Sequence, residues 1–154
     1  PAEVVMSLAE QKAVDVAKEM PEGTVILGSD TVVAADGKIL GKPKSHEEAY
    51  EMIRRLAGRS HQVYTGVCLV KKGPEGEADT VVSFYDETDV NVSSMTEKEI
   101  REYADSEEPM DKAGSYAVQG FFARYIDGLK GSYANVMGLP VHLVYQKLKK
   151  LGAL

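Results

Sequence analysis

Residues 24–43 read TVILGSDTVVAADGKILGKP. Most of this segment is an apolar run typical of a buried strand, and Asp36-Gly37 is a strong signal for a tight hairpin turn. The return strand is expected over residues 38–41. One carboxylate, Asp30, interrupts the apolar run. A carboxylate in such a strand is costly unless it is paired, so Asp30 is a candidate for a structural ion pair or for a functional site.

The segment before this hairpin is predicted to be a helix, because its apolar residues recur at helical spacing. The stripe is expected to comprise Val5, Leu8, Val16 and Met20, with Ala9, Ala13 and Ala17 beside it. Lys12 falls on the same stripe. Two interpretations of Lys12 remain open: a lysine that extends from the edge of the stripe into water, or a cation directed into a cleft.

Two further helices have clear start signals. Ser45 and Glu48 have the spacing of a capping box, as do Thr96 and Glu99. The first of these helices is expected to stop at Gly58. The second of these helices is expected to be short and to end at Glu107-Glu108-Pro109.

The remaining elements suggest hairpins and a closing helix. Strands are predicted over residues 62–70 and 80–92, which together look like a long hairpin, and another strand over 121–126. Residues 133–138 are expected to form a loop, and Pro140 to open a final helix. The chain is therefore predicted to be a single α/β domain, residues 1–154, built around a mixed β-sheet with flanking helices.

Composition and charge limit the function classes. With 154 residues, 44% of them hydrophobic and 27% charged, the chain is an ordinary globular domain rather than a disordered or fibrous one. Its net charge of −6 argues against nucleic-acid binding, because nucleic-acid binders are usually basic. No apolar run is long enough to span a membrane. The single cysteine, Cys68, excludes an intrachain disulfide, which favours a reduced, cytoplasmic compartment.

Four polar residues stand in apolar or glycine-rich surroundings: Lys12, Asp30, Lys42 and Gln119. Asp30 and Lys42 flank the hairpin and are expected to approach each other across it. That pair is open to a purely structural interpretation. Two lysines and a carboxylate also suit phosphate chemistry, because the carboxylate can hold a divalent cation or accept a proton while the lysines neutralise phosphoryl charge. None of the standard glycine-rich phosphate-binding motifs is present.

Five motifs, in order along the chain, carry a resemblance to a known family. They are GSDTVV at 28–33, GKP at 41–43, HQVYTG at 61–66, DKAG with YAVQG across 111–120, and GLP at 138–140. These motifs closely resemble those of the Maf family of nucleoside triphosphate pyrophosphatases, historically called septum formation inhibitors. The resemblance covers nearly the whole chain.

The resemblance implies a fold like that of the inosine triphosphate pyrophosphatases, an elongated mixed sheet with two lobes around a nucleotide cleft. It implies hydrolysis between the α and β phosphates of a nucleoside triphosphate, with release of the monophosphate and pyrophosphate. A divalent cation, Mg²⁺ or Mn²⁺, is the implied cofactor, and a homodimer the implied assembly. No nucleic-acid or membrane partner is expected.

The resemblance also assigns residues. Asp30 matches the family's general base and is the expected metal ligand, while Lys12 and Lys42 match phosphate-binding lysines. Thr31 and Gln119 match positions tied to substrate choice, and they resemble the subgroup that acts on dTTP, UTP and modified pyrimidine nucleotides. A glutamine amide both donates and accepts hydrogen bonds, so it suits reading of a pyrimidine edge.

The family's N-terminal strand and Ser-x-Ser-Pro-Arg-Arg loop have no counterpart in these residues, so the arginines expected on the triphosphate are not among them. Three alternatives stay open, and the absent arginine loop favours the first. The first is a catalytically weak nucleotide-binding or regulatory dimer linked to cell division. The second is a pyrophosphatase for purine nucleotides or 7-methyl-GTP. The third is a structural module in which Asp30 and Lys42 are only an ion pair.

Two residues near Gln119 also have two possible roles each. Lys112 suits either a structural loop or the electrostatics of a cleft. Tyr116 is interpreted as a packing residue rather than a base-stacking one.

Overall fold

The computed structural model describes all residues, 1–154, and contains five α-helices and five strands. None of these helices combines the length and the apolar character needed to cross a membrane. The helices are α1 (Ala2–Ala17), α2 (His46–Leu56), α3 (Glu97–Ala104), α4 (Tyr133–Met137) and α5 (Val141–Lys150). The strands are β1 (Val25–Ala35), β2 (Lys38–Leu40), β3 (Ser60–Lys71), β4 (Thr80–Val92) and β5 (Ile126–Lys130). Three short 3-10 helices lie at Glu108–Asp111, Ala113–Ser115 and Phe121–Tyr125.

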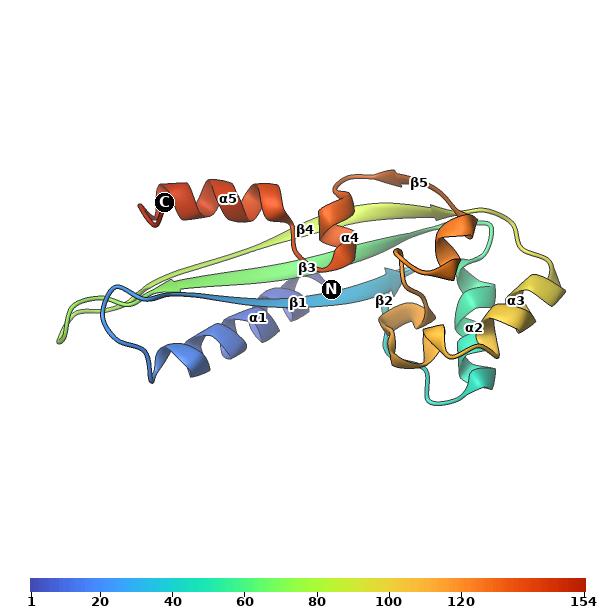
Figure 1. Cartoon of the computed structure of the whole chain (residues 1–154), viewed down its shortest axis with the longest axis horizontal. Coiled ribbons are helices and arrows are strands. Elements are labelled where there is room, and N and C mark those ends of the chain that lie inside the picture. The colour runs from blue at the N-terminus through green and yellow to red at the C-terminus, as the bar shows by residue number, and fades with distance from the viewer.

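The strands form one sheet in the order β2-β1-β3-β4-β5 (Figure 1). The predicted α/β class, with an elongated sheet and flanking helices, is confirmed. The predicted mixture of strand directions is wrong, because every neighbouring pair is antiparallel. The physical reason is the position of α2, which lies at the end of the sheet where β1 finishes, so that the chain enters β3 from that same end (Figure 1).

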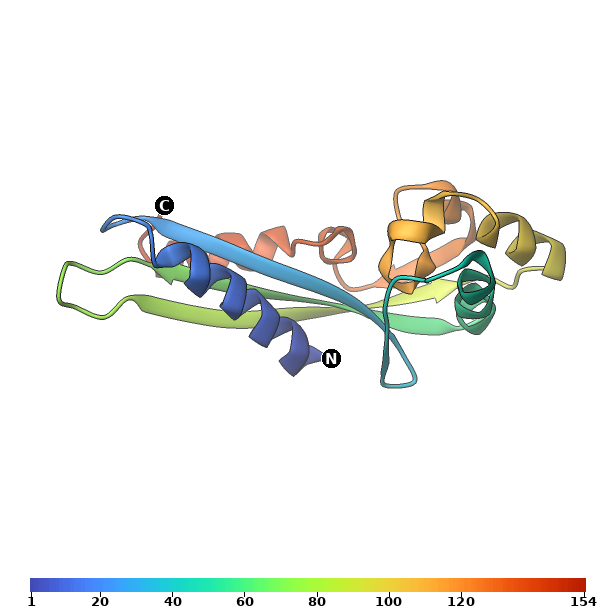
Figure 2. The same ribbon diagram turned by 90° about the horizontal axis from the view of Figure 1, so that it is seen from below.

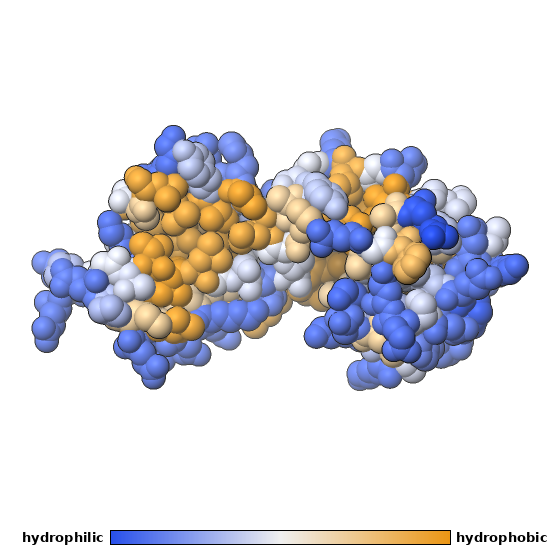
Figure 3. Space-filling model, viewed as in Figure 1, coloured by the Kyte–Doolittle hydropathy of each residue, from blue (hydrophilic) through white to orange (hydrophobic).

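The molecule has two parts. The long ends of β1, β3 and β4 form an extended arm, with α1 on one face and α5 on the other (Figures 1 and 2). The helices α2 and α3 and the 3-10 helices gather at the opposite end around a core that includes Ile53 and Phe122. Figure 3 shows these two masses joined by a narrower waist, with a continuous hydrophobic area over the arm.

Small residues let α1 approach the sheet very closely. A Cβ at Gly66 of β3 would lie 2.3 Å from the carbonyl group of Val5. The helix therefore buries its small face, Val5, Ala9, Ala13 and Ala17. The predicted stripe of larger side chains is wrong for three of its four members, since Leu8, Val16 and Met20 are 38%, 48% and 39% exposed.

The predicted turn and both predicted N-caps are confirmed, and one of the two predicted capping boxes is complete. Asp36 and Gly37 both have positive φ, 52° and 76°, as a two-residue hairpin turn requires. The capping box of Thr96 and Glu99 is complete, with both reciprocal hydrogen bonds. Ser45 caps α2 by accepting a hydrogen bond from the Glu48 N–H.

Two predicted elements are wrong. The expected strand over residues 121–126 is a 3-10 helix at Phe121–Tyr125, because the Glu108 carboxylate accepts hydrogen bonds from the N–H groups of Phe121 and Phe122. The expected loop over residues 133–138 contains the helix α4. Ser132 caps its start and Gly138, at φ 117°, ends it.

Candidate active site

Strand β1 carries candidate residues on both of its faces. Side chains alternate along a strand, so the adjacent residues Asp30 and Thr31 project to opposite sides of the sheet. Asp30 lies on the face covered by α1, where it contacts Lys12. Thr31 lies on the face covered by α4, close to Gly138. The predicted catalytic and specificity residues are therefore neighbours in sequence but separated by the sheet.

Lys12 and Asp30 form an ion pair between α1 and β1. The Lys12 Nζ lies 2.9 Å from Asp30 Oδ1 and donates a second hydrogen bond, of 3.1 Å, to the carbonyl oxygen of Ser29. The Lys12 side chain is 56% exposed and that of Asp30 20%. Lys12 lines none of the pockets described, so neither interpretation of it is decided by the pair with Asp30. Both groups remain open to solvent.

Lys42 does not pair with Asp30, and the expected approach of these two residues as an ion pair is wrong. Lys42 is exposed and forms no ion pair. The reason is that β2 pairs with β1 only from Val33 to Ala35, so the chain leaves the sheet before it comes opposite Asp30. The neighbouring Gly41 accepts a hydrogen bond from the Gly114 N–H, which places Lys42 beside the segment 112–119.

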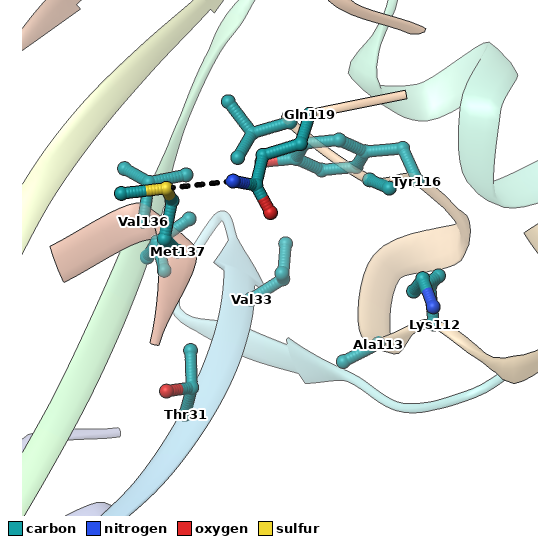
Figure 4. Close-up of a pocket in the computed structure, with 11 residues that line it drawn as sticks. Thr31, Val33, Lys112, Ala113, Tyr116, Gln119, Val136 and Met137 are labelled. Carbon is teal, nitrogen blue, oxygen red and sulfur yellow. Dashed lines mark hydrogen bonds between the residues drawn. The ribbon is translucent and has the colours of Figure 1, made fainter. Parts of the chain in front are cut away.

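A pocket of about 350 Å³ lies on the Thr31 face (Figure 4). It brings together two of the predicted residues, Thr31 and Gln119, and it does not include Lys12, Asp30 or Lys42. Lys112 also lines it, which favours the cleft interpretation of that lysine. The other lining residues are Val33, Val63, Ala113, Tyr116, Ala117, Val118, Val136 and Met137.

Two features hold the pocket segment 112–119 in place: the close packing of Gly114 against Val33 and a buried hydrogen bond of Tyr116. Gly114 has φ 71°, and a Cβ there would lie 2.8 Å from the Val33 side chain. The Tyr116 hydroxyl lies 2.6 Å from His61 Nε2, and both side chains are buried. Burial lowers the pKa of His61 to about 4, so this imidazole is neutral at pH 7. Tyr116 packs against Phe122, as predicted, and it also lines the pocket, whereas the role of His61 was not predicted.

Gln119 lines this pocket. Its Nε2 donates a 3.0 Å hydrogen bond to the sulfur of Met137. Figure 4 shows the amide oxygen turned toward Val33, across the pocket from Thr31. A polar side chain thus stands on each of two opposite walls of a mostly apolar cavity, an arrangement typical of small-molecule sites.

Behind Thr31 lies a buried polar cluster that the sequence reasoning missed. The Thr31 and Thr65 hydroxyl oxygens are 2.9 Å apart, and Thr65 donates a 3.0 Å hydrogen bond to the carbonyl oxygen of Asn135. Thr65 and Asn135 have no exposed surface. Strand alternation places Thr65 on the Thr31 face, but the participation of Asn135 depends on α4, which the sequence did not predict.

Comparison with known proteins identifies the family. The chain matches the family described as Maf-like protein over residues 1–151. It belongs to the Maf family. It is 47% identical to the dTTP/UTP pyrophosphatase of Lachnoclostridium phytofermentans over 152 residues, which cover 99% of this chain and 77% of that protein. It is also 47% identical to the dTTP/UTP pyrophosphatase of Agathobacter rectalis, over 99% of this chain and 80% of that protein. It is 46% identical to the dTTP/UTP pyrophosphatase of Carboxydothermus hydrogenoformans, over 99% of this chain and 79% of that protein.

The donor set of this Maf chain suits only a metal ion that its substrate helps to bind. No cluster of three or more histidine, cysteine, aspartate or glutamate side chains is arranged to hold a metal ion. Asp30, beside the unpaired edge of β1, is a single carboxylate. Mg²⁺ is commonly held by one or two carboxylates together with substrate phosphates, so Asp30 fits that type of site and not a preformed protein cage.

The edge of β1 lies between the candidate residues on the two faces of the sheet. Strand β2 covers this edge only at Val33–Ala35, and β3 occupies the other side, so the outer edge is unpaired from Val25 to Val32. Adjacent Cα atoms are about 3.8 Å apart. A ligand that crosses this open edge can therefore contact Thr31 on one face and Asp30 on the other.

Proposed function

We propose that this Maf chain is a nucleoside triphosphate pyrophosphatase that hydrolyses dTTP, UTP and modified pyrimidine nucleoside triphosphates to the monophosphate and pyrophosphate. The observation that carries the proposal is the position of Asp30 and Thr31 side by side at the open edge of β1. Asp30 forms an ion pair with Lys12, and Thr31 lines the pocket. The names of the relatives, dTTP/UTP pyrophosphatases at 43–47% identity, support the choice of substrate.

In this proposal the base occupies the pocket between Thr31 and Gln119, and the triphosphate extends over the edge of β1 toward Asp30. The volume of about 350 Å³ lies at the lower end of the range for small-molecule sites. Lys112 and Lys42 stand on or beside the segment that forms the pocket, so their charges favour an anionic ligand.

Asp30 is proposed as the general base. A carboxylate that is still 20% exposed can accept a proton from a water molecule aligned with the phosphorus atom. Lys12 holds one oxygen of this carboxylate in place, which leaves the other oxygen available for the water. The Lys12 and Lys42 ammonium groups are also proposed to neutralise the charge that builds up on the phosphate oxygens.

A divalent cation, Mg²⁺ or Mn²⁺, is proposed as the cofactor, with Asp30 as its protein ligand and phosphate oxygens completing its coordination. Such an ion would supply neutralisation of the phosphate charge. In this assignment one Asp30 oxygen contacts Lys12, and the other would serve both the cation and the attacking water. No other carboxylate is proposed as a ligand.

A homodimer is proposed as the assembly. The arm exposes apolar side chains of α1 and β1, including Leu8, Val16 and Leu27, beside an unpaired strand edge. Exposed apolar areas and open strand edges favour association between chains. Sedimentation velocity would give a mass of about twice 16.7 kDa if the proposal holds, and a monomer across the micromolar range would contradict it.

The test of the activity is pyrophosphate release from dTTP, UTP, CTP, GTP and 7-methyl-GTP, each with Mg²⁺, with Mn²⁺ and with a chelator. The expected result is turnover of dTTP and UTP that needs the cation. Preferential turnover of GTP or 7-methyl-GTP would instead assign the chain to purine nucleotides.

A binding function without catalysis is the second candidate. Two observations favour it: no arginine lines the pocket, and Asp30 is the only carboxylate assigned to the site. Equilibrium binding of UTP without pyrophosphate release, by a chain of the correct intact mass, would support this candidate over the enzyme.

A further inference from the structure

A chain of three hydrogen-bonding groups connects the pocket to the interior. Thr31 lines the pocket, and its hydroxyl oxygen lies 2.9 Å from the hydroxyl oxygen of Thr65. Thr65 lies 3.0 Å from the main-chain carbonyl oxygen of Asn135. Thr65 has no exposed surface, so water does not supply an alternative partner. The directions of these hydrogen bonds are therefore determined by the protein groups themselves.

The carbonyl group decides the direction. A carbonyl oxygen only accepts, so the single proton of Thr65 is donated to Asn135. Thr65 must then accept from Thr31, which uses the single proton of Thr31. The reverse arrangement would leave the Thr65 and Asn135 oxygens facing each other at 3.0 Å without a proton between them, in a site closed to water.

The position of the Asn135 carbonyl is itself fixed. The Asn135 Nδ2 donates to the carbonyl oxygen of Val63 and to the hydroxyl oxygen of Thr88, at 3.1 and 2.9 Å. Thr88 in turn donates to the carbonyl oxygen of Ser132. These bonds fasten the start of α4 to β3 and β4. The acceptor that orients Thr65 therefore has little freedom to move.

With its proton committed to Thr65, the Thr31 oxygen has only lone pairs left for a ligand. We propose that Thr65 is a positioning residue that fixes Thr31 as a hydrogen-bond acceptor, so that the pocket selects a base with a ring N–H over a base without one. This inference rests on the proposed function, in which the base occupies the pocket. Uracil and thymine carry such an N–H at N3, whereas N3 of cytosine is an unprotonated acceptor.

The chemistry of the two pyrimidines makes this a discriminating contact. Uracil and cytosine have almost the same shape, so an apolar pocket alone separates them poorly. Uracil N3–H donates to the Thr31 oxygen, while cytosine N3 would place a second lone pair against it. A site built to make one hydrogen bond rejects a ligand that leaves it unmade, by about tenfold to a hundredfold for a neutral pair.

The experiment compares equilibrium binding of UTP, CTP and N3-methyl-UTP to the full chain and to three variants. Thr65→Val removes the acceptor for the Thr31 proton, and Thr65→Ser retains it. Thr80→Val, exposed at the far end of β4, is the matched control.

In the wild type, UTP is expected to bind at least about tenfold more tightly than CTP or N3-methyl-UTP. In Thr65→Val the freed Thr31 proton can point to cytosine N3, so the UTP to CTP ratio is expected to fall about tenfold. Thr65→Ser and Thr80→Val should retain the wild-type ratio.

The outcomes distinguish a failure of this inference from a failure of the proposed function. If none of the nucleotides binds to the wild type, the proposed function fails and the inference fails with it. If nucleotides bind but N3-methyl-UTP binds as tightly as UTP, or Thr65→Val retains the wild-type ratio, only the inference is overturned. If Thr65→Val does not fold, Thr31→Val replaces it. That variant removes the acceptor directly, and an unchanged UTP to CTP ratio in it would overturn the inference.

Discussion

The Lys12 ammonium lies 2.9 Å from the Asp30 carboxylate and joins the middle of α1 to the middle of β1. Both side chains are partly exposed, at 56% and 20%, so solvent screens their attraction. A pair of this kind contributes little to folding, about 1 kcal/mol or less. Its importance is therefore expected to lie in the position of the carboxylate at the open edge of the sheet.

Asp30→Asn should reduce pyrophosphate release from dTTP by at least about a hundredfold, because an amide cannot accept the proton of the attacking water. The melting temperature should change little. Asp36→Asn is the matched control: it removes a carboxylate at the end of the same strand, and asparagine tolerates the positive φ of 52° there. Asp30→Asn turnover similar to that of Asp36→Asn would remove Asp30 from the mechanism.

Lys12→Met should raise the KM for nucleoside triphosphates by about tenfold, because one cation beside the phosphates is lost while an unbranched apolar side chain remains. The free energy of unfolding should change by less than about 1 kcal/mol. Lys18→Met, which breaks an exposed ion pair with Asp15 near the end of the same helix, is the control for KM. Steady-state kinetics on both variants would show whether the effect is specific to position 12.

Gln119→Glu should shift the substrate preference from pyrimidine toward guanine nucleotides. A carboxylate offers two acceptors to the N1–H and amino groups of guanine, whereas it repels the carbonyl oxygens of uracil. The ratio of kcat/KM for dTTP to that for GTP is expected to fall by about tenfold. Gln146→Glu introduces the same charge on the exposed surface of α5 and should leave the ratio unchanged. Equal ratios in both variants would show that Gln119 does not read the base.

Gly66→Ala should lower the free energy of unfolding by at least about 2 kcal/mol, because the new Cβ would lie 2.3 Å from the Val5 carbonyl group and α1 must move away. The same movement displaces Lys12 from Asp30, so turnover should fall as well. Gly128→Ala, where an added Cβ meets nothing within 4 Å, is the control. Chemical denaturation of the two variants provides the comparison, and equal stability would mean that α1 does not pack as the structure shows.

His61 should make the protein less stable at acidic pH. Burial lowers its pKa to about 4 in the folded state from 6.5, so between these values the unfolded chain binds a proton that the folded chain does not. Stability from this group is complete above pH 6.5 and is lost as the pH falls toward 4. The loss is about 3 kcal/mol, at about 1.4 kcal/mol for each pKa unit.

Denaturation curves at pH 7 and pH 4 would test this prediction with His61→Gln. Because glutamine does not titrate in this range, the variant should lose about 3 kcal/mol less than the wild type between the two pH values. His142→Gln, exposed on α5, should behave as the wild type does. Parallel pH dependence in wild type and His61→Gln would indicate that His61 is not buried in the neutral form.

Short-range signals explain the correct part of the prediction. The Asp36-Gly37 turn, the Thr96 capping box and the long hairpin of β3 and β4 each depend on residues close together in the chain. The motifs around Asp30 and Gln119 placed the chain in its family, and Thr31 and Gln119 do line one pocket. Sequence pattern was sufficient for these features because backbone preference and strand alternation determine them locally.

Contacts between distant residues decided the rest. Lys12 and Asp30 are 18 positions apart, Thr31 and Thr65 are 34 apart, and Thr65 and Asn135 are 70 apart. The alanine face of α1 is buried because Gly66 lets the helix backbone approach, and Phe121–Tyr125 is helical because Glu108 binds its N–H groups. Local periodicity carries no information about such partners. The ion pair of Asp30 and the direction of the Thr31 hydroxyl therefore follow only from the folded arrangement, in which the helices α1 and α4 and the strands β1 and β3 come within hydrogen-bonding distance.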